Sequence, residues 1–200
     1  MRPILTILFY LVVILNGFTQ NELTSQEHMK FKGIPIDGTL KDFVLKLEKK
    51  GFTYEKTEEG IAWFGGEFAS YNNCIIAVVS LKQKDLVCKT IVLFPDKDTW
   101  SSLSNNYFFL KELLTEKYGE PSKVVEKFDS SIQPSDDEDR MRKVKSYNCK
   151  YYTNYITDKG KIQLTIYHSE KDLYSSCFVR LSYYDKINGE IIRQKALNDL

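Results

Sequence analysis

The strongest constraint on the fold is a segment that occurs twice in the chain. Residues 84–96 begin with Lys-Asp-Leu and pass through Cys88, and residues 171–185 begin with Lys-Asp-Leu and pass through Cys177. In both copies an Asp lies eight residues after the Cys, and the intervening residues alternate in character as in a β-strand. We therefore expect two equivalent strands, one in each half of the chain.

Side chains on a strand point alternately to its two faces. The repeated segment therefore predicts two sets of residues that each share a face: Cys88, Thr90, Val92 and Phe94 in the first copy, and Cys177, Val179, Leu181 and Tyr183 in the second.

A helix is expected before the strands of each half. Apolar residues from Leu40 to Leu47 recur at helical spacing, with Thr39 as a candidate N-cap and Gly51 as a stop signal. A second apolar stripe runs from Trp100 to Tyr118 and stops at Gly119. Each helix is followed by apolar or alternating segments of strand length.

The expected strands lie at about 52–56, 60–71, 74–81 and 86–94 in the first half, and at 123–128, 144–157, 161–168 and 176–184 in the second. The fold class is thus α+β, a tandem repeat of two helix-plus-four-strand antiparallel sheet units. The first unit is expected at 28–97, the second at 98–186, and a C-terminal tail at 187–200, part of which can form a short helix.

The N-terminus has the order of a secretory signal. Arg2 precedes the apolar run Ile4–Leu15, and the small residues Gly17 and Thr19 fit a cleavage site before Gln20. The run is shorter than the ~20 residues of a membrane span, so we expect a cleaved signal peptide at 1–19, with a retained anchor as the alternative. The protein is therefore expected to be exported, to the periplasm or the medium, with no stable membrane span after cleavage.

Composition excludes some functions. The chain has 200 residues, 42% of them hydrophobic, and its 28 Lys and Arg balance 27 Asp and Glu. It can bury a core, and it has no overall charge that would draw it to nucleic acid.

Four cysteines in an exported chain raise the question of disulfides. Strand register opposes a bond between Cys74 and Cys88, and Cys149 and Cys177 are expected on strands separated by a third, about 9–10 Å apart. Small buried side chains are the favoured interpretation, while a bridge between the two halves stays open.

No catalytic or cofactor motif is present. His28 falls in a polar lead-in and His168 at a strand end, so both are expected at the surface. Two histidines without a Cys-x-x-Cys do not indicate a metal site, and no phosphate-binding glycine motif occurs. The acidic segment Asp129–Arg140 is expected to be a mobile hairpin loop. We therefore predict no catalytic residues, cofactor or metal.

Tyrosine placement is the feature that suggests binding. Eight of the thirteen tyrosines lie between Tyr147 and Tyr184, and tyrosine is enriched at recognition surfaces, although aromatic residues also simply suit strands. In the first copy of the repeated strand the second face is apolar, so that sheet is expected to be covered on both sides. In the second copy it carries Arg180 and Ser182, which predicts one solvent-facing side. The predicted binding residues on it are Phe178, Arg180 and Tyr184, with Gln163, Thr165 and Tyr167 from the neighbouring strand.

Two resemblances accompany this pattern. The run Met29–Leu40, with Lys50-Gly51-Phe52 after it, resembles the start of a family of uncharacterised exported bacterial proteins of similar length. The tandem helix-plus-four-strand plan is similar to the β-lactamase inhibitor protein family, whose two units form a concave sheet that grips a partner enzyme. The second likeness is one of plan and rests on no shared residue motif.

We expect an exported, non-catalytic binding module that recognises a protein or cell-envelope ligand through an aromatic-rich sheet face. A hydrolase with a carboxylate-based site that forms no motif is the alternative, and a purely structural envelope protein is a third. A deep cleft with convergent carboxylates, or His168 beside a cysteine, would favour the enzyme, whereas a shallow tyrosine-lined sheet would favour binding.

Overall fold

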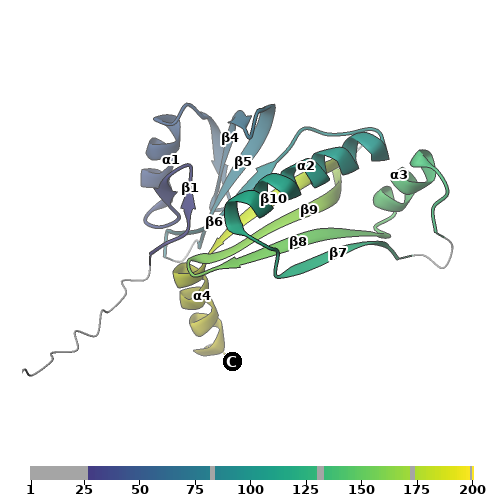
Figure 1. Ribbon diagram of the computed structural model, residues 1–200. Coiled ribbons are helices and arrows are strands. Elements are labelled where there is room, and N and C mark those ends of the chain that lie inside the picture. Colours follow the sequence, from purple (N-terminus) through teal and green to yellow (C-terminus); the bar gives the residue numbers. More distant parts are fainter. Residues whose placement is uncertain (1–26, 82–83, 130–132, 172–173, 199) are drawn as a thin grey trace, which may run out of the picture.

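The computed structural model describes residues 27–81, 84–129, 133–171, 174–198 and 200 (Figure 1). The predicted signal peptide, 1–19, lies outside the described residues. The elements in chain order are β1 (Lys30–Phe31), β2 (Ile34–Pro35), α1 (Leu40–Glu48), β3 (Thr53–Glu58), β4 (Ile61–Phe68), β5 (Tyr71–Leu81), β6 (Leu86–Leu93), α2 (Trp100–Tyr118), β7 (Lys123–Phe128), α3 (Asp137–Lys145), β8 (Cys149–Thr157), β9 (Gly160–Lys171), β10 (Tyr174–Asp185) and α4 (Lys186–Asn198).

The long strands form one antiparallel sheet of eight strands. Its order is β3-β4-β5-β6-β10-β9-β8-β7, so each half of the chain contributes a meander of four consecutive strands. The two meanders join where β6 pairs with β10. The α+β class and the antiparallel strands are as predicted, but the strands make a single sheet instead of the two that the repeated segment suggested.

One face of this sheet carries the core. Val92 of β6 and Leu181 of β10 are direct partners, and both are buried. Because directly opposite residues point to the same side, the buried faces of the two meanders are continuous. We call this side the inner face and the opposite side the outer face.

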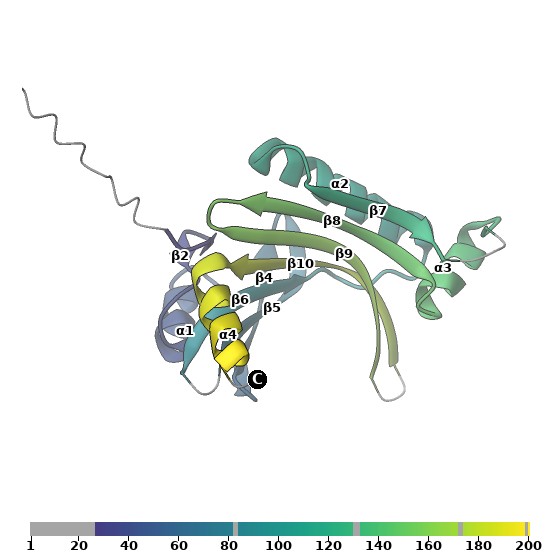
Figure 2. The same cartoon turned by 90° about the horizontal axis from the view of Figure 1, so that it is seen from below.

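Helices α1 and α2 pack on the inner face. The buried residues of α1 are Leu40, Phe43 and Leu47, and those of α2 include Trp100, Leu103, Tyr107, Leu110 and Leu114. Figure 1 shows α2 running along β9 and β10, whereas α4 projects from the sheet in a different direction from α1 and α2 (Figures 1 and 2).

The predicted helix ends are confirmed by local hydrogen bonds. The Thr39 hydroxyl accepts a bond from the Asp42 amide at 3.1 Å, as an N-cap does. Gly119 follows α2 with φ +80°, a left-handed conformation that glycine adopts without the Cβ penalty of other residues.

The acidic segment predicted as a mobile loop contains α3 instead. Asp136 caps this helix by accepting from the Asp139 amide at 2.7 Å. The next residue, Asp137, accepts bonds from the Trp100 and Ser101 amides at 3.0 and 2.7 Å, so it caps the N-terminus of α2. The predicted strand 144–157 is correspondingly shorter, because Val144 still belongs to α3.

The repeated strand is interrupted at Cys88. A register shift lies between Val79 and Ser80 of β5, opposite Cys88. Val87 is therefore buried with Thr90 and Val92, while Cys88 is half-buried. The prediction that Cys88 shares the face of Thr90 was wrong because a bulge adds one residue and breaks the alternation.

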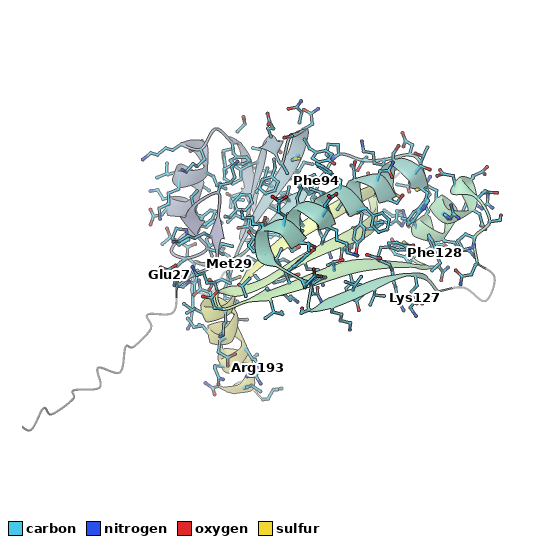
Figure 3. The ribbon with its side chains drawn as sticks, viewed as in Figure 1. Glu27, Met29, Phe94, Lys127, Phe128 and Arg193 are labelled. Atoms are coloured by element: carbon cyan, nitrogen blue, oxygen red, sulfur yellow. The ribbon has the colours of Figure 1, made fainter. Side chains whose placement is uncertain are left out.

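The lead-in before the first strand is held by the last residue of β10. The Asp185 carboxylate accepts bonds from the Met29 amide at 2.7 Å and the Asn188 amide at 2.7 Å, and lies 3.1 Å from His28 Nδ1. His28, expected at the surface of the lead-in, is half-buried and lies between Asp37 and Asp185, so the lead-in is tied to the fold. Figure 3 shows Glu27 and Met29 beside the start of α4, and Arg193 further along that helix.

The predicted tail is also more ordered than expected. Helix α4 starts at Lys186, directly after β10, because Asp185 bonds the Asn188 amide three residues on. The buried Asn188 amide group in turn donates to the carbonyls of Ile36 and Val87 at 3.0 and 2.8 Å. These bonds fasten the start of α4 to both ends of the first half.

Candidate binding face

The six predicted binding residues all lie on the outer face of β9 and β10. The register pairs Phe178 with Tyr167 and Arg180 with Thr165. Gln163 is opposite Ser182, and Tyr184 is opposite Lys161. The pairing therefore brings the six residues to the same side of two adjacent strands, away from α1 and α2.

Stacking organises the cations on this face. The Arg180 guanidinium lies 4.2 Å from the centre of the Tyr167 ring, and the Phe178 ring centre is 5.6 Å from that of Tyr167. Two lysines, Lys89 and Lys161, hold their ammonium groups 4.7 and 4.5 Å from the Tyr184 ring. Such contacts fix the direction of long basic side chains while leaving their charge available.

The predicted residues differ in exposure. Tyr167 is 38% exposed, but Phe178 is only 7% exposed and Ser182 only 1%. The expectation that Phe178 lies in contact with solvent was therefore wrong; its ring packs beside that of Tyr167. Phe178 supports the Tyr167 ring, whereas Tyr167, Arg180 and Tyr184 can reach a partner.

The charged residues described on the outer face of five neighbouring strands are all basic. Within the ranges described, the charged residues in the outer-face register of β6, β7, β8, β9 and β10 are Lys89, Lys123, Lys127, Lys150, Lys161, Lys171 and Arg180. The acidic residues of the same strands, Glu126, Glu170 and Asp185, belong to the inner-face register. The outer face of this part of the sheet is therefore basic, although the whole chain has a net charge of only +1.

Several of these cations lack a carboxylate partner. Lys127 and Lys150 both contact Asp129. Among the described residues, no acidic side chain lies within ion-pair distance of Lys89, Lys161 or Arg180, and Arg180 Nε has no hydrogen-bond partner. A buried donor without a partner is costly, and an anion supplied by a ligand would satisfy it.

The first half extends the face with apolar residues. Ile91 and Leu93 were expected to be covered, but they are half-buried, and Ile75 beside Leu93 is 42% exposed. Trp63 lies opposite Ala77 on the same side. The residues that sequence reasoning missed are Trp63, Ile75, Lys89, Lys123, Tyr152 and Lys161. The alternation within each strand was visible in the sequence, but only the β6–β10 pairing places Trp63, Ile75 and Lys89 of the first half on the same face as the second half.

The alternative, an enzyme, would depend on His168. The register sets His168 opposite Cys177, and its Nε2 lies 2.9 Å from the Ser175 hydroxyl. His168 is 5% exposed, so the expected surface position was wrong, and its Nδ1 has no partner in the described structure. Burial raises the pKa of the Cys177 thiol, which opposes formation of a nucleophilic thiolate. The register therefore meets one of the conditions set above for an enzyme, an imidazole opposite a cysteine. The Ser175 hydroxyl and, at 4.0 Å, Glu170 Oε1 lie near its Nε2 atom.

Desolvation also raises the pKa of the other three cysteine thiols. All four cysteines are unpaired. Burial raises the pKa of Cys74 to about 11 and that of Cys149 to about 12. Cys149 and Cys177 lie on β8 and β10, which β9 separates, as the sequence predicted.

Neither a metal site nor a known relative identifies the function of this face. Within the described ranges, no three His, Cys, Asp or Glu side chains are arranged to hold a metal ion. The helices described are too short or too polar to cross a bilayer. No protein-family model, curated protein or solved structure matches the chain.

Proposed function

We propose that the chain is an exported, non-catalytic binding module that recognises a protein or cell-envelope ligand through the outer face of β6, β10, β9 and β8. The observation that carries the proposal is that basic side chains of that face stack on tyrosines and have no carboxylate partner among the described residues. Arg180 on Tyr167 and the two lysines on Tyr184 combine charge with flat apolar area. Arg and Tyr are the residue types that contribute most binding energy at protein interfaces.

The partner's contact surface is acidic. Lys89, Lys161 and Arg180 present positive charge, and no carboxylate of the described strands shares their face. An acidic protein surface would supply partners to these cations and would be steered toward them from solution. The apolar flank of Trp63, Ile75 and Ile91 would bury against the same partner.

The two halves of the chain form a tandem repeat in this proposal. Both contain a helix followed by four antiparallel strands, with α3 added between β7 and β8 in the second. The last strands of the halves pair with each other, so the face is built from both copies. This plan is similar to that of the β-lactamase inhibitor protein family, in which a sheet grips an enzyme.

The export part of the proposal has its own test. Expression of the full chain in its own cell, followed by mass spectrometry of the N-terminus, should find a product that begins at Gln20 outside the cytoplasm. A product that keeps residues 1–19 in the cytoplasm would refute export.

The binding proposal is tested by capture from the cell envelope. The wild-type protein and the Arg180→Ala/Tyr184→Ala double variant are immobilised, and captured proteins are compared. The control variant Lys41→Ala/Leu45→Ala changes one basic and one exposed apolar residue on α1, on the inner side. A partner retained by wild type and control but lost by the double variant supports the face. Equal capture by the wild type and both variants refutes it.

Ionic strength gives a second readout of the same complex. Because the cations are at the surface, raising the salt from about 0.05 to 0.5 M should weaken capture by screening their attraction. Capture that does not change with salt would contradict an acidic contact surface.

A further inference from the structure

A cleft lies on the inner side of the molecule, between the C-terminal half of α2 and the turns of the first half. It consists of two adjoining pockets of about 400 and 280 Å³. Both are lined by Lys32, Phe68, Lys117, Tyr118 and Tyr183. In Figure 1 the C-terminal end of α2 lies near β1, and residues of both elements line the larger pocket. The cleft is therefore separate from the outer face and is formed only where the two halves meet.

The smaller pocket is mainly apolar. Its floor is Leu181 and Tyr183 of β10, and one wall is formed by Leu110, Leu113 and Leu114 of α2. Leu113 lines this pocket and is 38% exposed. An apolar ligand that filled the pocket would remove these leucine surfaces from water, which is favourable.

Positive charge lies at the junction of the two pockets. Lys32 lies 5.8 Å from the Phe68 ring centre, and Lys117 lies 5.2 Å from that of Tyr118. Neither lysine has an acidic partner among the described residues. The larger pocket adds Lys30 and Lys159, which both contact Glu27, and a single acidic lining residue, Asp158. The cleft thus has an excess of cations beside an apolar wall.

Two tight hairpin turns form the other wall. Lys32 and Gly33 join β1 and β2, and Ala69 and Ser70 join β4 and β5. All four residues have φ between +50° and +80°, as the central residues of two-residue hairpin turns do. The two turns therefore set the positions of Lys32 and Phe68 beside the cleft.

We propose that this cleft binds an anionic amphiphile, with a carboxylate head between Lys32 and Lys117 and an unbranched apolar chain along Leu110, Leu113 and Leu114. Taken together, the two adjoining pockets have the size of a small-molecule site. The lysines supply charge-assisted hydrogen bonds to the head, and the leucines and Phe68 supply the apolar contact. The site does not depend on the outer face binding a partner.

The test uses the purified protein and sodium dodecanoate below its micelle concentration, followed by isothermal titration calorimetry. Acetate tests the head alone, and dodecyltrimethylammonium tests the same chain with a positive head. Dodecanoate should bind, and acetate and dodecyltrimethylammonium should bind at least about tenfold more weakly, because each lacks one of the two favourable contacts.

Variants separate the head from the chain. Lys32→Asn/Lys117→Gln should weaken dodecanoate binding about tenfold, the effect of losing a charge-assisted bond. Leu113→Ser should weaken it severalfold through lost apolar contact. The matched control is Lys46→Gln, because Lys46 occupies the last turn of α1 as Lys117 occupies that of α2, and it lines neither pocket. Circular dichroism checks that each variant is folded.

The salt dependence of dodecanoate binding tests the role of the lysines in the wild-type protein. Raising the salt from about 0.05 to 0.5 M should weaken dodecanoate binding by screening the two lysines. The proposal is refuted if dodecanoate does not bind, if dodecyltrimethylammonium binds equally well, if salt has no effect, or if Lys46→Gln weakens binding as much as the double variant. Loss of partner capture at the outer face has no bearing on these outcomes.

Discussion

Val92 of β6 and Leu181 of β10 face each other at the centre of the sheet, and each lies four residues after the cysteine of its own repeated segment. Their exposed fractions are 0% and 2%. Equivalent positions of the two segments thus meet in one buried pair. This contact joins the cores of both halves, so the two halves are expected to unfold together.

Removing the Leu181 side chain should test this coupling. Leu181→Ala should lower the free energy of unfolding by about 2–5 kcal/mol, through lost apolar contact and a cavity. The measurement is urea denaturation followed at Trp63 in the first half and Trp100 in the second, using variants that keep one tryptophan each. Both signals should have the same midpoint in wild type and variant. The exposed Leu45→Ala serves as control and should change stability by at most about 0.5 kcal/mol.

Two separate midpoints in the wild-type protein would contradict a shared core. They would mean that the β6–β10 contact contributes little to either half.

The Asp137 cap on α2 predicts a pH-dependent effect. Its bonds, first from the Ser101 hydroxyl and also from the backbone amides, lower the pKa of Asp137 below its usual range, although desolvation opposes this. A lowered pKa in the folded state stabilises the fold above the unfolded value of about 3.9, and the contribution is lost as pH falls through the lower folded value. Asp137→Asn should therefore reduce the melting temperature at pH 7, and the difference from wild type should shrink below about pH 4.

The comparison is Glu112→Gln on the exposed side of α2, which removes one negative charge without removing a cap. If Glu112→Gln lowers the melting temperature at pH 7 as much as Asp137→Asn does, net charge rather than capping explains the effect.

The buried thiols predict slow modification. Because burial raises the pKa of Cys74 to about 11 and of Cys149 to about 12, little thiolate exists at pH 8. Iodoacetamide at pH 8 should label these two cysteines slowly in the native protein and rapidly in 6 M guanidinium, as peptide mass spectrometry would measure. Rapid native labelling, or recovery of either cysteine in a disulfide, would contradict the geometry.

Replacing glycine by alanine should have opposite effects on stability at two positions, Gly160 and Gly189. A Cβ on Gly160 would lie 2.0 Å from the Tyr184 carbonyl oxygen, so Gly160→Ala requires a backbone shift in the β9–β10 pair and should strongly destabilise the protein. Gly189 lies within α4 and has no atom within 4 Å of such a Cβ. Gly189→Ala should stabilise by about 0.5–1 kcal/mol, since glycine is a poor helix former. Thermal unfolding measures both, and similar effects of the two variants would contradict this assignment.

The outer-face variants have a predicted cost of their own. Arg180→Ala loses the stacking on Tyr167, and Tyr184→Ala loses the contacts of Lys89 and Lys161. Each change should lower the free energy of unfolding by about 0.5–1 kcal/mol, leaving the protein folded. Urea denaturation measures this, and it must precede the capture experiment. An unfolded double variant would remove this face as the explanation of any lost capture.

Local patterns in the sequence were enough to predict two features that do not depend on long-range contacts, helix α1 and the marked helix ends. The spacing of Leu40, Phe43 and Leu47 gave α1, and Thr39 and Gly119 marked helix ends, because these signals depend on residues within one or two turns. The acidic composition at 136–139 misled the prediction of a loop, since its aspartates serve as helix caps. Caps that bridge two helices depend on tertiary contacts and leave no local pattern.

The sequence by itself determined the two sets of strands, the apolar side of each helix and the alternation that places Arg180 and Tyr184 opposite the core. Only the tertiary structure decided that β6 pairs with β10, that His28 lies against Asp185, and that cations from several strands share one outer face. The reason is physical: alternation is fixed by the geometry of a single strand, whereas the partner and register of a strand depend on how buried surfaces distant in sequence fit together.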